Sequence, residues 1–343
     1  MKYIDQILRD NYRAFELEKF GVTAQWSTLL LTPQFVTSRH VVALIFAAGA
    51  RVPSLVVKIP RQPGDNDSVR KEAEVLLQLK SLGVGCEQGA PEVVGVLDVG
   101  EHTVLIETAV AGNLLEPQLV AANFPRAVDA GMNFVAGMPC TKSAPENSDW
   151  YQRTIGSPLR ELASLLPTGM EVAALVDRTH EVLAPLRSVQ LPAVVEHGDL
   201  CYQNLFLQPN GRLQVVDWER SRLDGLPAHD LIFYLQYVGQ SQERALASRQ
   251  LQLTAFENAF SPGGWALGPL AQHLRLRNVD TELLPQLVVA TWARSAATLA
   301  YRLAGQSARG GETSHVQAAV MADRDFWLWR HAVTNWKSRS AYV

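Results

Sequence analysis

The sequence has few cysteines, few lysines and no long apolar run. Its three cysteines are scattered over 343 residues without CxxC or metal-ligand spacing, which argues against a thiolate metal site and is typical of a reducing cytoplasm. No apolar run approaches the ~18 residues of a membrane span. The first ten residues carry charges where a signal peptide needs an apolar core. We therefore expect a cytoplasmic protein that is neither membrane-embedded nor exported.

An excess of charge of either sign is also missing. The formal net charge is -3, so the chain lacks the basic footprint of a nucleic-acid-binding protein. Hydrophobic residues make up 47% and charged residues 19%, a globular rather than a disordered composition. Among the basic residues only seven are lysines and twenty-four are arginines. A lysine inside an apolar strand is therefore informative.

The pattern of apolar residues changes near residue 110. Residues 1–110 predict a helix at the start, five strands at 29–31, 40–47, 54–59, 93–99 and 103–108, and one main helix at 68–82. Residues 111–343 predict mostly long helices, including 116–138, 281–304 and 312–336, with a hairpin at 205–216. The expected fold class is α+β and bilobal, with a strand-rich N-terminal lobe, a larger helical C-terminal lobe and a ligand site in the cleft between them.

The most informative segment is EHGDLCYQN at 196–204, followed by VVDWE at 215–219. Asp199, Asn204 and Asp217 are separated by a short loop and a tight hairpin, so their side-chain oxygens are able to converge. Mg²⁺ prefers such oxygen ligands and completes its shell with water and substrate phosphates. In phosphoryl transfer a carboxylate aligns the attacking hydroxyl and accepts its proton. The segment is thus a candidate phosphotransfer site.

The pattern H-G-D-x-x-x-x-N, then an apolar pair and D-W-E, resembles the aminoglycoside phosphotransferase and choline kinase family of small-molecule kinases. This resemblance implies a protein kinase-like fold, ATP as phosphate donor with GTP as an alternative, and Mg²⁺ as cofactor. It implies that Asp199 is the catalytic base, that Asn204 and Asp217 hold Mg²⁺, and that His197 supports the loop. Asp230, at the start of the next helix, resembles the aspartate that braces this loop; an ordinary helix-capping acid is the alternative.

Lys58 lies in the apolar strand LVVKIP, where an unpaired ammonium group is costly to bury. By resemblance Lys58 holds the α- and β-phosphates of the nucleotide. Glu72 and Glu74 both lie on the following helix but about 200° apart, so only one faces the cleft. The family pattern favours Glu72. The alternative is a solvated lysine at a strand edge with two surface acids.

The nucleotide site has two weaker elements. The segment from Glu107 to Val110, including Ala109, resembles the hinge whose backbone groups bind the adenine edge. The phosphate-covering loop at 32–40 contains no glycine, unlike the loop of the protein kinases. Family members often carry a serine just before the second strand, and Ser38 is nearest to that place. Arg39 is an alternative source of charge for phosphate.

We expect an ATP- and Mg²⁺-dependent phosphotransferase acting on a hydroxyl of a small molecule, such as a sugar, aminocyclitol, aminoglycoside or natural product. A catalytically silent kinase-like binding protein is the alternative. Protein-kinase activity is disfavoured by Gly198 and by the short segment after Asp217. Late aromatic residues suit a sugar ring or a cation but also suit a core. The last residues of the chain include no acidic side chain that could bind a polycationic acceptor, although the carboxylate of Asp224 remains available for this role. The sequence leaves the acceptor and the oligomeric state open.

Overall fold

A computed structural model describes residues 2–23, 25–31, 40–141, 150–166, 170–307 and 313–335, with the side chains of 170 and 301–316 left aside. Ser38 and Arg39 lie outside the described residues. By internal contacts the chain divides into unit 1, Met1–Leu115 with Tyr202–Ser221, and unit 2, Glu116–Cys201 with Arg222–Val343. Residues Asn204 and Asp217 thus belong to unit 1. The predicted boundary between lobes 1–110 and 111–343 stays a prediction.

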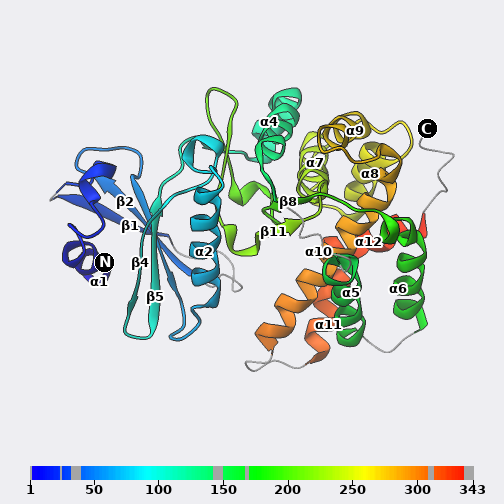
Figure 1. Ribbon diagram of the computed structural model, residues 1–343, viewed down its shortest axis with the longest axis horizontal. Coiled ribbons are helices and arrows are strands. Elements are labelled where there is room, and N and C mark those ends of the chain that lie inside the picture. Colours follow the sequence, from blue (N-terminus) through cyan, green and yellow to red (C-terminus); the bar gives the residue numbers. More distant parts are fainter. Residues whose placement is uncertain are drawn as a thin grey trace. The chain divides into compact units, whose positions relative to one another are not determined.

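Unit 1 is built on an antiparallel five-stranded sheet with the strand order β1-β2-β3-β5-β4 (Figure 1). Its strands are β1 (Trp26–Leu31), β2 (His40–Ala47), β3 (Leu55–Pro60), β4 (Val93–Val99) and β5 (His102–Thr108). The five predicted strands are all present. The first begins three residues earlier than predicted, because Trp26 to Thr28 also pair with β2.

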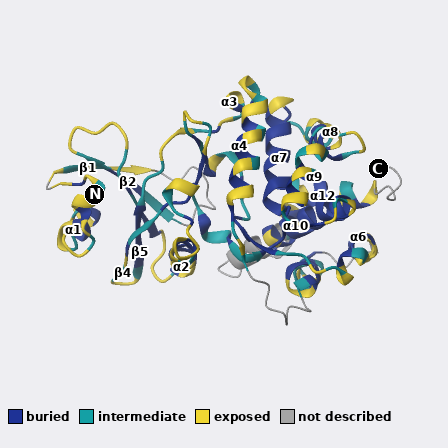
Figure 2. Cartoon of the chain, turned by 45° about the horizontal axis from the view of Figure 1, so that its top comes forward, coloured by how far each residue is buried: buried dark blue, intermediate teal, exposed yellow. Residues whose placement is uncertain are grey.

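Helices cover both faces of this sheet. On one face, α1 (Lys2–Asp10) buries Ile4 and Leu8 in a core with strand residues that include Ile106. On the other, α2 (Asp67–Ser81) buries Val69 and Ala73 against Leu105. Since successive strand residues point to opposite faces, the neighbours Leu105 and Ile106 serve the two separate clusters. The buried interior of the strands is visible in Figure 2.

Unit 1 also contains a second, smaller sheet with the order β10-β9-β6. Its strands are β6 (Asn113–Leu114), β9 (Leu205–Leu207) and β10 (Leu213–Val215), flanked by the short helices η5 (Tyr202–Asn204) and η6 (Trp218–Arg220). The predicted hairpin at 205–216 corresponds to β9 and β10. The start of β9 and the end of β10 lie side by side. Asn204 directly precedes β9, and Asp217 follows β10 by two residues. The remaining short helices are η1 (Leu17–Phe20) and η2 (Cys86–Gln88).

Unit 2 is mainly helical. Its three-stranded sheet has the order β11-β8-β7, from β7 (Cys140–Thr141), β8 (Ala193–Glu196) and β11 (Arg222–Gly225). The helices are α3 (Pro117–Ala122), α4 (Phe124–Gly137), η3 (Gln152–Gly156), α5 (Ser157–Leu165), α6 (Met170–Val182), η4 (Ala184–Ser188), α7 (His229–Gln242), α8 (Arg249–Phe260), α9 (Leu267–Leu276), η7 (Thr281–Leu283), α10 (Leu284–Ser307), α11 (Thr313–Ala322) and α12 (Arg324–Thr334).

Two predicted helices are each divided into two. The predicted helix 116–138 breaks at Asn123, whose side chain accepts a hydrogen bond from the Arg126 N–H and starts α4 with a proline in its first turn. The predicted helix 312–336 breaks at Asp323, which caps α12 by accepting from the Asp325 N–H. Each break occurs at a capping residue. The apolar periodicity continues across both residues and therefore predicts one uninterrupted helix in each case.

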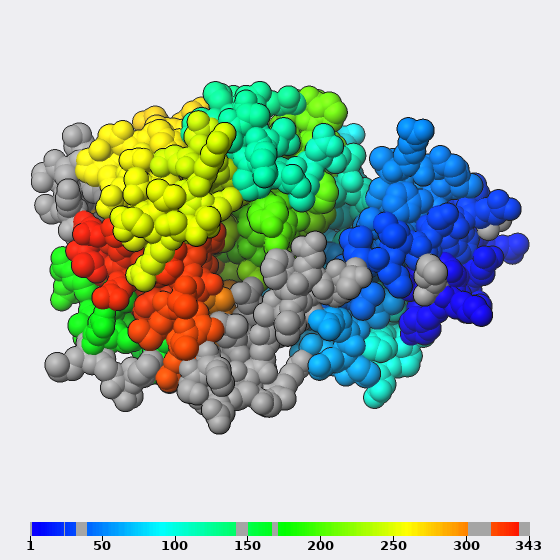
Figure 3. Space-filling model, turned by 180° about the vertical axis from the view of Figure 1, so that it is seen from behind, coloured from blue at the N-terminus to red at the C-terminus, as the bar shows by residue number. Residues whose placement is uncertain are grey.

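Helix α7 is the centre of unit 2. Every residue from His229 to Ser241 is buried, whereas a surface helix exposes one face. The helices α3, α4, α8 and α10 contact it. Among its neighbours, Phe124 of α4 packs edge-on against Trp265 with ring centroids 4.8 Å apart. Figure 3 shows the α3–α4 segment beside the α8–α9 segment on one face of the unit. Within the described residues, no helix has the length and apolar character needed to cross a membrane.

Candidate active site in two parts

Unit 1 contains a buried charge cluster. Lys58 on β3 is 7% exposed, and its Nζ lies 2.6 Å from Glu72 Oε1 on α2 and 3.0 Å from Glu107 Oε1 on β5. The structure therefore brings together Lys58 and Glu72, the predicted pair, while Glu74 is exposed. The Glu107 side chain was not predicted to take part. In the register Glu107 pairs with Val56, two residues from Lys58, so both side chains share one face of the sheet.

Two buried glutamates share one lysine in this cluster. Burial opposes the charge of Lys58, but Glu107 and Glu72 outweigh it and raise the pKa of Lys58 above its ordinary value. Burial raises the pKa of Glu72 to about 8 and that of Glu107 above its ordinary value, and Asp217 adds further negative charge to both. The Oε2 atoms of both glutamates have no hydrogen-bond partner within the described residues. Such a group of buried oxygens fits an additional cation.

Asn204 and Asp217 lie next to each other at the ends of β9 and β10. The Val216 N–H donates to the Asn204 carbonyl at 3.0 Å, which fixes the position of the following residue. Asp217 has φ 68°, a left-handed conformation that aspartate adopts more readily than most residues. The next N–H, from Trp218, donates to Glu72 Oε1 at 2.9 Å and so ties this turn to the lysine cluster.

The donor set here fits Mg²⁺. It consists of one carboxylate and one amide oxygen, and Mg²⁺ usually takes one or two protein carboxylates with water and phosphates. Among the described residues there is no group of three or more His, Cys, Asp or Glu side chains that would hold a metal without such help. The assignment of Asn204 and Asp217 as magnesium ligands stays a prediction.

Unit 2 contains its own candidate region, the loop after β8. Asp230, at the start of α7, accepts from the His197 N–H at 2.6 Å and from the Gly198 N–H at 2.9 Å. The Asp199 N–H donates to His197 Nδ1 at 3.2 Å, so a neutral His197 ring carries its proton on Nε2. Gly198 has φ 80°, which glycine adopts without strain. Asp230 and His197 thus set the backbone on either side of Gly198 and lead it to Asp199.

A buried ion pair that sequence reasoning missed lies immediately before this loop. Glu196 receives two hydrogen bonds from Arg294 on α10, at 2.6 and 2.8 Å, and one from the Leu226 N–H at 2.9 Å. Burial raises the pKa of Glu196, but Arg294 outweighs it, and the pKa falls to about 2. The available signal was the one used for Lys58, because Arg294 lies in the apolar run LVVATWARSAATLA.

Burial also shifts two further groups beside this ion pair. Desolvation, with the nearby charge of Glu196, raises the pKa of Asp230 to about 7. Desolvation lowers the pKa of His229 to about 4, and its Nε2 lies 3.9 Å from Glu196 Oε1. The loop therefore rests on a buried network of charged and neutral groups at the junction of β8, α7 and α10.

Other predicted residues are placed without being joined to these clusters. The Ala109 N–H donates to the Ser54 carbonyl at 3.0 Å, and its proposed contact with adenine stays a prediction. Of the late aromatic residues, Trp292, Trp327 and Trp329 are buried, and the Trp329 indole donates to Thr179. These three pack in the core of unit 2. The Tyr301 side chain and Trp336 lie outside the described residues.

Solved structures with a similar fold include several small-molecule kinases. The aminoglycoside phosphotransferase APH(4)-Ia is 13% identical over 96% of this chain and 100% of that chain, with a TM-score of 0.55. An amicoumacin kinase is 12% identical over 96% and 98% (TM-score 0.53), and the choline kinase LicA from Streptococcus pneumoniae is 11% identical over 95% and 100% (TM-score 0.51). No curated protein matches.

The sheet order, the helical second unit and these similarities define a protein kinase-like fold of the α+β class. The family model described as the phosphotransferase enzyme family matches residues 38–266 of the 343. The chain belongs to this family.

Proposed function

We propose that the chain is an ATP- and Mg²⁺-dependent phosphotransferase that transfers the γ-phosphoryl group to a hydroxyl of a small molecule. The observation that carries the proposal is the buried Lys58–Glu72–Glu107 cluster, which is tied through the Trp218 N–H to the turn that holds Asp217. A lysine with excess carboxylate around it and an oxygen ligand pair beside it suits a nucleotide bound with its cation. Membership of the phosphotransferase family supports the same activity.

In this proposal each residue has a defined task. Asp199 accepts the proton of the acceptor hydroxyl, and the hydroxyl oxygen forms a bond to the γ-phosphorus. The bond from that phosphorus to the β–γ bridging oxygen breaks, and the nucleoside diphosphate leaves with the electron pair. Asp230 and His197 hold the loop that presents Asp199. Lys58 binds the α- and β-phosphates, and Glu72 keeps its ammonium group in place.

Asn204 and Asp217 hold Mg²⁺, which when bound neutralises phosphate oxygens and orients the nucleotide. ATP is the proposed donor and GTP the alternative. Solved relatives are recorded with AMP-PNP and hygromycin B in one case, and with AMP-PNP, Ca²⁺ and amicoumacin in another. Those ligands support a nucleotide and a small hydroxylated acceptor here.

The test is transfer of labelled phosphate from ATP and from GTP to a panel of sugars, aminoglycosides, hydroxy acids and amino alcohols, detected by mass spectrometry. We expect Mg²⁺-dependent transfer that Asp199→Asn lowers by a factor of about 10² or more, in line with general-base catalysis. Asp177→Asn, on the exposed face of α6, is the matched control and should retain full transfer. A folded Asp199→Asn protein with wild-type turnover would refute the role of Asp199.

The metal ligands have a separate test. Asp217→Ala should abolish Mg²⁺-dependent tightening of nucleotide binding in isothermal titration, because it removes the only carboxylate of the proposed ligand pair. Unchanged Mg²⁺ dependence would remove this assignment. Nucleotide binding without turnover on any acceptor would instead favour the silent binding protein.

A further inference from the structure

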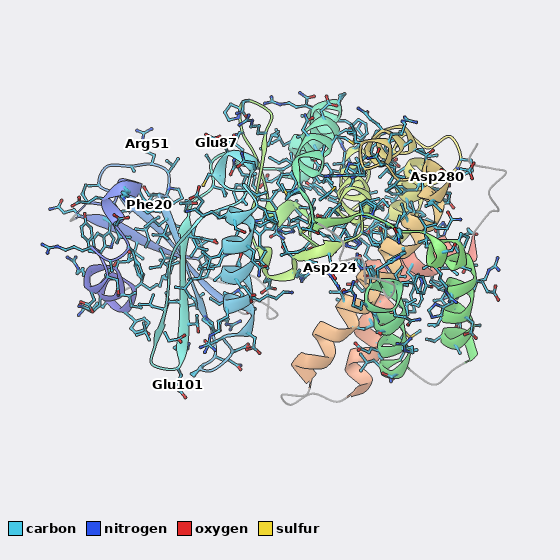
Figure 4. The ribbon with its side chains drawn as sticks, in the orientation of Figure 1. Phe20, Arg51, Glu87, Glu101, Asp224 and Asp280 are labelled. Carbon is cyan, nitrogen blue, oxygen red and sulfur yellow. The ribbon has the colours of Figure 1, made fainter. Side chains whose placement is uncertain are left out.

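Two arginines of unit 2, Arg222 on β11 and Arg153 on η3, lie beside one carboxylate. Asp224 on β11 accepts from Arg222 Nε at 3.1 Å and from Arg222 Nη2 at 3.3 Å. Arg153 Nη2 of η3 lies 3.5 Å from the same carboxylate. Figure 4 labels Asp224, which lies on β11. One carboxylate therefore serves two guanidinium groups, and the cluster has a net charge of about +1 at neutral pH.

The two guanidinium groups retain donors that face solvent. The Arg153 and Arg222 side chains are 44% and 32% exposed, and each has five N–H donors in a fork that matches carboxylate or phosphate. Burial raises the pKa of Asp224, but the hydrogen bonds and charge of Arg222 outweigh burial and hold this pKa below its ordinary value. Asp224 is thus already committed to arginine and does not offer a free acid to a cationic acceptor.

Further arginines extend the positive charge along η3. Arg160 donates to Gln152 at 2.8 Å, and the Arg187 guanidinium lies 4.9 Å above the Tyr151 ring. Within the described part of the chain, neither arginine forms an ion pair with a carboxylate. Arg160 contacts the residue before Arg153, and Arg187 contacts the residue two positions before it. Arg153, Arg160 and Arg187 thus lie on or beside η3.

This cluster is near the proposed base. Arg222 pairs with Glu196 across the sheet, and Glu196 precedes Asp199 by three residues. Consecutive Cα atoms are about 3.8 Å apart and paired ones about 5.5 Å, so the Cα atoms of Arg222 and Asp199 lie within about 17 Å of each other. A β-bulge between Arg222 and Gly225 inserts an extra residue into β11. Bulges commonly redirect side chains beside active sites.

We propose that the acceptor carries, besides the hydroxyl that is phosphorylated, a carboxylate or phosphate group that binds Arg153 and Arg222. The inference rests on the proposed phosphotransferase function and narrows its substrate class to anionic hydroxylated small molecules. Asp224 orients the two guanidinium groups and limits their positive charge. A polycationic acceptor is disfavoured, because it would meet two arginines where a binding carboxylate is needed.

The experiment compares ligands that differ only by the anionic group: D-glucitol with D-gluconate, and glycerol with glycerol 3-phosphate. Kanamycin serves as the polycation. Binding to the full chain with Mg²⁺ and a non-hydrolysable ATP analogue is measured by isothermal titration, and phosphate transfer from ATP is followed in parallel. The two pairs separate recognition of carboxylate from recognition of phosphate.

We expect at least one anionic member to bind about tenfold more tightly than its neutral partner, the effect of one charge-assisted contact. Arg153→Gln and Arg222→Gln should each remove most of this preference, and Asp224→Asn should increase it by removing a competing charge. The matched control is Arg178→Gln, because Arg178 pairs with Glu181 on the exposed face of α6. This control should leave the preference unchanged.

Three results would overturn the inference: equal binding within both pairs, tighter binding of kanamycin, or a preference that survives both arginine variants. Transfer to neutral or cationic acceptors alone would reject the anion site and leave the phosphotransferase intact. Arginine-dependent anion binding without transfer to any acceptor would keep the site and reject the phosphotransferase. The two proposals therefore fail in different ways.

Discussion

Replacing Arg294 by methionine should destabilise unit 2 by about 3–5 kcal/mol, the usual cost of removing one partner of a buried ion pair. The Arg294 residue is 6% exposed and Glu196 is 2% exposed. After the substitution, the partners of Glu196 among the described residues are the Leu226 N–H and a distant, uncharged His229. A buried carboxylate with one donor is poorly compensated for its lost hydration.

The pKa of Glu196 gives an independent magnitude. A fall from 4.5 to about 2 corresponds to roughly 3 kcal/mol at 1.36 kcal/mol per unit. For a unit of this size each kcal/mol moves Tm by about 2–4 °C, so the single variant should melt roughly 10 °C lower. In the double variant Glu196→Gln with Arg294→Met, no carboxylate is left unpaired. Much of the lost stability should therefore return.

Thermal and urea unfolding of the wild type, both single variants and the double variant form the assay. The lowered pKa also sets the pH dependence: this stabilisation is fully present above the ordinary pKa of 4.5 and is lost as the pH falls towards 2. A loss below 1 kcal/mol in Arg294→Met, or no recovery in the double variant, would refute the reasoning.

Three further predictions concern other buried sites. Between pH 6.5 and 4 the unfolded chain binds a proton at His229, while the folded chain, in which the pKa of His229 is lowered to about 4, does not. The wild type should therefore lose roughly 3 kcal/mol of its free energy of unfolding over this range, and His229→Phe should not show this loss. Gly131→Ala should cost about 1–3 kcal/mol in chemical denaturation, since its Cβ would lie 2.1 Å from the Tyr234 ring. Glu107→Gln should lower the Kd for ATP about tenfold in isothermal titration, because one of the charges competing with phosphate for the strand lysine disappears.

Each of these has its own control or contrary result. Gly137→Ala on the same helix meets nothing within 4 Å and should be neutral or stabilise by up to about 1 kcal/mol; equal effects at Gly131 and Gly137 would contradict the packing argument. Unchanged acid sensitivity in His229→Phe would assign the pH dependence to other groups. Weaker ATP binding in Glu107→Gln would show that its charge positions the lysine more than it repels phosphate.

Much of the fold follows from local sequence patterns. Strand and helix periodicity predicts the five strands and α2, and the cost of burying a lone ammonium group predicts an acidic partner for Lys58 in LVVKIP. Helix geometry predicts that only one of Glu72 and Glu74 faces the cleft, and the family pattern favours Glu72. These features depend on residues that are close together in the sequence, or on the contact between one strand and the helix that follows it.

The remaining features depend on contacts between distant residues. Glu107 was assigned only a backbone role, because nothing in LIETAVAG shows that its side chain shares a face with Lys58 until the strand register is known. Glu196 and Arg294 are 98 residues apart, and no local pattern links them. The breaks at Asn123 and Asp323 depend on side-chain caps that compete with an uninterrupted apolar periodicity.

The scarcity of lysine makes the buried Lys58 a chemical reporter. Among the lysines whose side chains are described, Lys2, Lys19, Lys71 and Lys80 are exposed, whereas Lys58 is buried. An amine-reactive reagent should therefore modify those four within the time of mixing, and Lys58 only when unit 1 opens or unfolds. The rate of labelling at Lys58, read by peptide mass spectrometry, would time the opening of the nucleotide-binding cluster without any mutation, and a bound nucleotide should slow it.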